Sequence, residues 1–224
     1  MIINPFIYSS APPDIVTDGL ILRLDAGNVA SYPGSGTVWT DLTTPQYDGT
    51  LTNGVGFDSG NDGTLVFDGV DDYVVSSMSK TIMGGTFSIS IWFRPTGAQS
   101  SKGIMSIANS NNSTGPMVLL QRQSSTLTRW AVGNAYVFST TNLDDAFVNL
   151  TLTYDGTTWK QFKNGIASGT HVGSNAPAGS NTWLGAGYNG KFNGKIPIYN
   201  VWDKALTPAE ITQNFDALKG RYGL

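Results

Sequence analysis

Short apolar runs separated by turn residues recur along most of the chain, from Gly19 onward. The clearest run is Thr86–Arg94, in which apolar and polar side chains alternate. Because successive side chains of a strand point to opposite faces of a sheet, this period of two predicts a half-buried strand. Trp92 is an exception, since it falls on the otherwise polar face. Phe147–Tyr154 alternates in the same way and predicts a second strand of this kind.

Turn signals connect these runs into an antiparallel arrangement. Asp155-Gly156 and Asn164-Gly165 are dipeptides that tolerate positive φ, and they bracket the β-rich run Trp159–Lys163. Turns spaced about 8–12 residues apart favour an antiparallel sandwich over alternating β and α elements. The remaining predicted strands are Leu20–Leu24, Thr64–Phe67, Tyr73–Ser76, Ile104–Ala108, Met117–Arg122, Arg129–Val132, Thr182–Leu184 and Gly194–Trp202.

One helix is predicted near the C-terminus, at about 208–219. The sequence Thr207-Pro208-Ala209-Glu210 fits an N-cap, a proline at the first helical position and a capping-box glutamate. Ile211, Phe215 and Leu218 then form one apolar stripe. Glu210 is the one glutamate of the chain, so its predicted role is to cap this helix.

The first 18 residues differ in character from the rest of the chain. They carry prolines at positions 5, 12 and 13 and show neither a strand nor a helix period. They are too apolar for an ordinary solvated tail, with Ile2, Ile3, Phe6, Ile7 and Tyr8 as candidate anchoring residues. This segment either packs against its own domain or docks on another chain. We therefore expect an extended arm, 1–18, and one domain, 19–224.

The composition excludes several kinds of chemistry. The chain has no cysteine, so sites that need a thiol cannot form. It has one glutamate and one histidine, His171, which lies in a predicted loop. Charged residues make up only 13%, the formal net charge is −3, and no Lys/Arg cluster is present, which argues against a nucleic-acid partner. No apolar run reaches the roughly 18 residues of a membrane span. No catalytic motif is recognisable, and we expect a protein that is not an enzyme.

Several segments together carry a family resemblance. They are 65–74 (LVFDGVDDYV), 87–95 (FSISIWFRP), 154–160 (YDGTTWK), 164–165 (NG), 193–196 (NGKI) and 202–211 (WDKALTPAEI). In this order they resemble laminin-G-like, concanavalin A-like lectin/glucanase domains over about residues 19–216. The resemblance implies an all-β, two-sheet antiparallel jelly-roll sandwich. Glucanases of that fold use paired glutamates, which this chain cannot supply.

Both ends of the domain are similar to versions found in tailed-phage virion proteins. These segments are 19–28 (GLILRLDAGN), 31–36 (SYPGSG), 39–42 (WTDL) and 213–224 (QNFDALKGRYGL), whereas 43–46 (TTPQ) departs from the usual run. The similarity implies a capsid decoration, fibre or tail-associated module, assembled in the host cytoplasm and placed on the virion. Other virion proteins would bind the N-terminal arm, and we expect a homo-oligomer.

Two sets of residues are candidates for ligand binding. Asp68, Asp71 and Asp72 offer carboxylates for a hard cation such as calcium, although turn and strand-start formation is the favoured explanation for them. Aromatic residues can stack on a sugar while polar neighbours bind its hydroxyls. Five aromatic residues lie among Asn, Gly and Ser in the second half of the chain, namely Trp130, Tyr136, Trp183, Tyr188 and Phe192. We take Trp130, Tyr136, Tyr188 and Asn189 as the candidates, with a core position as the alternative for each aromatic. The competing function is therefore a carbohydrate-binding module or adhesin for host surface glycans, assisted by calcium.

Overall fold

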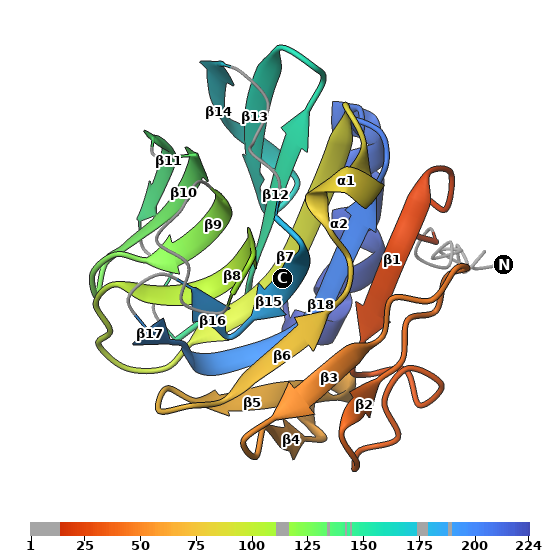
Figure 1. Ribbon diagram of the computed structural model, residues 1–224, viewed down its shortest axis with the longest axis vertical. Coiled ribbons are helices and arrows are strands. Elements are labelled where there is room, and N and C mark those ends of the chain that lie inside the picture. The colour runs from red at the N-terminus through yellow and green to blue at the C-terminus, as the bar shows by residue number, and fades with distance from the viewer. Residues whose placement is uncertain are drawn as a thin grey trace, which may run out of the picture.

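The computed structural model describes residues 14–110, 117–133, 135–141, 143, 145–173, 179–187 and 190–224. Its strands form two sheets that pack face to face as a sandwich, with one short helix near the C-terminus (Figure 1). This arrangement confirms the predicted all-β jelly roll. Within the described residues, no helix is long and apolar enough to cross a membrane.

Sheet A contains the two strands with the clearest alternation. Its order is β14 (Ile166–Val172), β13 (Thr158–Lys163), β12 (Val148–Tyr154), β7 (Phe87–Pro95), β18 (Asn193–Trp202), β5 (Thr64–Asp68) and β4 (Gly56–Asp58), and β1 (Leu20–Asp25) also pairs with β18. In the register of β7 with β12, Ile91 lies opposite Leu150. Both side chains are fully buried in the core, as the period of two predicted. The polar faces are buried too, as Ser90 and Thr151 show, so the prediction that these strands are half-buried is wrong.

Sheet B supplies the other side of the core. Its order is β11 (Ala135–Thr141), β10 (Leu127–Gly133), β9 (Met117–Arg122), β8 (Lys102–Ala108), β15 (Asn181–Leu184), β6 (Tyr73–Ser76), β3 (Gly49–Thr52) and β2 (Val38–Trp39). A short hairpin of β16 (Ala186–Gly187) and β17 (Gly190–Lys191) joins this sheet at β8. Helical turns α1 (Lys80–Met83) and η1 (Gly60–Asp62) complete the connections.

The C-terminal helix covers the outer face of sheet A. Helix α2 spans Pro208–Leu218 and continues as the 3-10 helix η2 (Lys219–Tyr222), close to the predicted range of 208–219. Its capping box is formed as predicted, with Thr207 and Glu210 bonding reciprocally. Trp92 packs here with Phe215 and Tyr222. An aromatic side chain on the polar face of β7 is thus explained by the helix that covers it.

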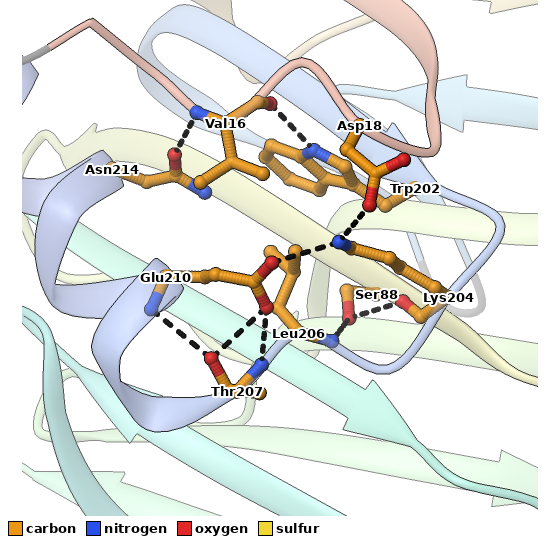
Figure 2. A network of polar contacts seen from close by, with 9 residues as sticks. All are labelled: Val16, Asp18, Ser88, Trp202, Lys204, Leu206, Thr207, Glu210 and Asn214. Atoms are coloured by element: carbon orange, nitrogen blue, oxygen red, sulfur yellow. Dashed lines mark hydrogen bonds and ion pairs between the residues drawn. The ribbon is translucent and has the colours of Figure 1, made fainter.

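Residues 14–18, the described part of the predicted arm, are held between α2 and β18 (Figure 2). The backbone N–H of Val16 donates to Asn214 Oδ1 at 2.7 Å, and Trp202 Nε1 donates to the Val16 carbonyl at 2.9 Å. Lys204 Nζ bridges Asp18 at 2.5 Å and Glu210 at 2.7 Å. Residues 14–18, at the end of the predicted arm, therefore contact the domain that follows them. The candidate anchoring residues Ile2, Ile3, Phe6, Ile7 and Tyr8 lie outside the described residues.

Candidate functional site

The three aspartates predicted as metal ligands converge at one turn. One carboxylate oxygen from each of Asp68, Asp71 and Asp72 lies within 4.8 Å of the others. The turn between β5 and β6 brings the three side chains together. Asp71 and Asp72 lie in this turn, before β6 begins, so their side chains do not have to point to opposite faces of a sheet as neighbours in a strand would. Gly69 adopts φ 79°, and a Cβ there would lie 2.8 Å from the Asn193 Cβ, so the turn requires glycine.

Asp72 is the buried member of this acidic cluster, with only 3% of its surface exposed. Its Oδ2 accepts a hydrogen bond from the backbone N–H of Asp68 at 3.0 Å. Its Oδ1 has no hydrogen-bond partner within the described part of the chain. Burial raises the pKa of Asp72. The hydrogen bond from the Asp68 N–H lowers this pKa, and the negative charges of Asp68 and Asp71 raise it further.

An aromatic pair on the outer face of sheet B lies next to the acidic cluster. The Tyr73 ring, directly after Asp72, contacts the Trp183 ring with centroids 5.6 Å apart and planes tilted by 54°. Both side chains are half-buried. Trp183 points outward because Thr182 and Leu184, its neighbours on β15, face the core. The pair therefore presents aromatic surface to solvent at the edge of the acidic cluster.

Lys191 connects the aromatic pair with the carboxylates. Its Nζ lies 4.6 Å from the centroid of the Tyr73 ring, a cation–π distance. Burial lowers the pKa of Lys191, while the charge of Asp71 raises it. The β16–β17 hairpin that carries Lys191 packs on β8 at Gly103. A Cβ at that position would collide with the Gly187 backbone, so the packing requires glycine there. We call Asp68, Asp71, Asp72, Tyr73, Trp183 and Lys191 the acidic–aromatic patch.

The structure corrects one predicted sugar-binding residue. Trp130 is fully buried between the sheets, where it pairs with Leu120 and Phe138 across β9–β11, so the prediction that it contacts a sugar is wrong. Tyr188, Asn189 and the side chain of Tyr136 lie outside the described residues. Trp183 was one of the five aromatic residues considered from the sequence, but it was not chosen as a candidate. Its outward direction follows from its central position in the predicted strand Thr182–Leu184, because side chains alternate along a strand and the two end residues are buried.

The patch combines groups that suit two ligand types. Aromatic faces stack on the apolar C–H faces of sugars, while Lys191 can donate to hydroxyls and Asp71 can accept from them. The clustered carboxylates are oxygen ligands of the kind that hard divalent cations prefer.

Comparison with known proteins agrees with the fold. The family model described as the concanavalin A-like lectin/glucanases superfamily matches residues 67–212, which is more than half of the chain. No curated protein matches the chain by sequence.

Solved structures share the fold at low sequence identity. Domain 4 of AbnA, an extracellular arabinanase from Geobacillus stearothermophilus solved with arabinotriose, has a TM-score of 0.68 and 14% identity, covering 87% of this chain and 97% of that one. The binding domain of botulinum neurotoxin DC with SialylT has a TM-score of 0.71 and 15% identity, covering 91% and 52%. The same domain with rat synaptotagmin II gives 0.68 and 14%, covering 89% and 52%, so this chain spans about half of the toxin domains. By its sequence match and its fold, the chain belongs to the concanavalin A-like lectin/glucanases superfamily.

Proposed function

We propose that this chain is a non-catalytic carbohydrate-binding module whose ligand lies on the acidic–aromatic patch. The observation that carries the proposal is the half-buried pair of Tyr73 and Trp183 on the outer face of sheet B, with Lys191 beside it. Elsewhere in the sandwich most large aromatic side chains are buried, as Trp130 is. Two partly exposed aromatic rings flanked by a donor and an acceptor are the arrangement by which proteins commonly hold sugars.

The comparisons support this proposal at the level of the fold. A domain of the same architecture, from the arabinanase, was solved with arabinotriose, and it aligns with this chain over 97% of its own length. The family that the chain belongs to is named for lectins and glucanases, both of which bind carbohydrates. These likenesses support sugar binding as a class of function.

The proposed module is non-catalytic, because neither the one glutamate nor the one histidine of the chain lies on the patch. Glu210 accepts from the backbone N–H of Thr207 at 2.8 Å and pairs with Lys204, so it caps α2 on the far side of the sandwich. His171 lies on strand β14, not in the loop that the sequence predicted. Neither residue belongs to the patch.

A printed glycan array tests the proposal, together with calorimetric titration of the sugar that binds. Trp183→Ala and Tyr73→Ala should each weaken binding about tenfold or more, since a stacked ring contributes about 0.5–1.5 kcal/mol beyond the area it buries. Trp130→Phe is the matched control, because it changes a tryptophan in the core and leaves the patch intact. A blank array with folded wild-type protein would overturn the proposal, as would unchanged affinity in both patch variants.

A second proposal concerns where the module works, namely on a phage virion as a decoration, fibre or tail-associated protein. The segments 19–28, 31–36, 39–42 and 213–224 motivate it, and one structural observation favours it. The described chain starts beside α2 on the outer face of sheet A, whereas the strands that carry Tyr73, Trp183 and Lys191 (β6, β15 and β17) belong to sheet B (Figure 1). Attachment to other virion proteins through the preceding arm would leave the patch accessible.

Mass spectrometry of purified particles tests this location. Wild-type protein should be present on the virion, and a chain that lacks residues 1–13 should fold, remain in the host cytoplasm and be missing from particles. Normal incorporation of the truncated chain would refute anchoring by the arm. Absence of the wild-type chain from every particle would refute virion membership itself.

A further inference from the structure

Two long strands at one side of the sandwich each have a free edge. β14 ends sheet A and β11 ends sheet B, and within the described residues each pairs with one neighbour only, β13 and β10 respectively. Both strands have seven residues, and neither contains Asp, Glu, Lys, Arg or Pro. Natural proteins usually protect a free strand edge by charge, by proline or by keeping the strand short, and these two strands have none of these protections. We call β11 and β14 together the open side.

The strand edges on the opposite side of the sandwich are protected (Figure 1). β2 and β4 have only two and three residues. β1, which pairs only with β18 at that border of sheet A, carries Arg23 and Asp25. This contrast indicates that the open side is the one that can accept a further strand.

The two free edges lie directly on each other, one in each layer. Gln161 of β13 donates to Thr140 of β11 at 3.0 Å and to Ser168 of β14 at 2.9 Å. A Cβ at Gly169 of β14 would lie 2.6 Å from the Phe138 ring of β11, so the two strands are closely packed. A partner that pairs with one edge therefore meets the other edge as well.

We propose that the open side binds a second copy of this chain, in a side-by-side dimer that extends both sheets. A strand without Asp, Glu, Lys or Arg can pair with its own copy, because no like charges meet across the axis. A two-fold axis perpendicular to the sheets makes β14 antiparallel to its copy. The strands of two aligned sheets stay within about 30° of each other, so the same axis makes β11 antiparallel to its copy. A single extended peptide, by contrast, would cover only one of the two edges.

The composition and size of the open side determine the affinity that we expect. Ile166 and Val172, at the two ends of β14, are 73% and 77% exposed, and a dimer would cover part of this apolar surface. Each copy contributes two strands of seven residues, fewer than the roughly 20–30 residues per partner of a standard-size interface. We therefore expect a weak dimer with a Kd of about 10 μM, which dissociates to monomers in dilute solution.

The dimer would present both acidic–aromatic patches in the same direction. Because the axis is perpendicular to the sheets, sheet B of one copy lies on the same side as sheet B of the other. Tyr73 and Trp183 of both copies then face one way, while α2 and residues 14–18 of both copies face the other. Two patches that reach one surface together bind it more strongly than a single patch does. This last step rests on the carbohydrate-binding function proposed above.

Analytical ultracentrifugation at concentrations on both sides of about 10 μM tests the dimer. Thr170→Lys charges an exposed position of β14 and should weaken dimerisation about tenfold or more, because the two copies of the charge lie close together. Ser139→Lys, at an exposed position of β11, answers the same question if the first variant fails to fold. Val29→Lys is the matched control, since this exposed valine follows β1. Wild-type protein that stays monomeric, or folded β14 and β11 variants that dimerise like wild type, would overturn the inference.

A single introduced cysteine tests the geometry, because the chain has no cysteine of its own. A bulge at Ser168 interrupts β14, so Gly169–Val172 is its longest uninterrupted stretch, and Thr170 lies within it. Residues opposite each other in an antiparallel pair have Cβ atoms about 4.5–5.5 Å apart, near the range of a disulfide. Thr170→Cys should therefore form a disulfide-linked dimer under mild oxidation, and Val29→Cys should not. Equal cross-linking of the two variants would contradict pairing through β14.

Retention on a surface coated densely with the bound sugar tests the effect of having two patches. Wild-type protein should dissociate about tenfold more slowly than Thr170→Lys, or slower still, whereas both should bind the free sugar equally in calorimetry. Equal retention would overturn the gain from two patches. If neither protein binds any sugar, the carbohydrate function fails and this gain fails with it, while ultracentrifugation separately decides the dimer.

Discussion

The rings of Trp92 and Phe215 stack in parallel, with centroids 5.6 Å apart and planes 4° apart. Trp92 comes from β7 and Phe215 from α2, so this contact fixes the helix to the outer face of sheet A. Tyr222 adds a second ring at 4.4 Å from Trp92. These residues belong to a second apolar core, separate from the one between the sheets, with Ile15, Phe147, Ile198 and Leu218 as further buried members. The domain is thus a three-layer structure at this point: helix, sheet A, sheet B.

Replacing Phe215 by alanine should lower the free energy of unfolding by about 2 kcal/mol, because a half-buried ring and its stacking partner lose their contact. Urea denaturation measures the change. Val172→Ala is the control, since that side chain is 77% exposed and its loss should cost less than about 0.5 kcal/mol. Equal stabilities of the two variants would contradict the idea that the stack secures α2.

Removing the capping box of α2 should lower the free energy of unfolding by less than removing the Phe215 ring. Thr207→Ala removes the hydroxyl that accepts from the Glu210 N–H and should cost about 1 kcal/mol in urea denaturation. Thr126→Ala, at an exposed turn position, should be close to neutral by comparison. A Thr207→Ala variant as stable as wild type would show that packing alone determines where the helix begins.

The sequence predicted the central strands and the helix because each carries a strong local pattern. Thr86–Arg94 differs from β7 by one residue at each end, and the capping box located the start of α2. Strand β14 was missed, and His171 was placed in a loop, because the segment IASGTHV shows no alternation of apolar and polar residues. Its strand geometry comes from pairing with β13, a tertiary cause that no local pattern reveals.

The candidate site shows the same division between local and tertiary causes. Asp68, Asp71 and Asp72 lie within five residues of one another, so a turn was enough to bring them together. Trp183 and Lys191 are more than 100 residues away and reach the patch only through the pairing of β15 with β6 and of β17 with β8. The error at Trp130 has a related cause, since aromatic type alone does not tell which face of a strand is buried.

Acid should destabilise the protein in part through Glu210. Hydrogen bonding to Lys204 and to the Thr207 backbone lowers the pKa of Glu210 in the folded state. A group with a lowered folded pKa stabilises the fold fully above its unfolded pKa, about 4.3, and this contribution is lost as the pH falls through the folded value. Glu210→Gln should therefore be less stable than wild type at pH 7 and approach it in acid. Urea midpoints measured from pH 7 to pH 3 check this, and parallel curves would contradict it.

The boundary of the folded domain can be tested by two truncations, because residues 14–18 contribute contacts of their own. Ile15 is buried, Val16 makes two hydrogen bonds, and Asp18 pairs with Lys204. A chain that starts at residue 14 should keep these contacts, whereas one that starts at residue 19 exposes apolar surface and leaves Trp202 Nε1 and Asn214 Oδ1 without their partners. The shorter chain loses the burial of one isoleucine and two hydrogen bonds, so its free energy of unfolding should be lower by about 3–5 kcal/mol. Urea denaturation of both chains measures it. If the two truncations are equally stable, residues 14–18 are part of the arm and not of the domain.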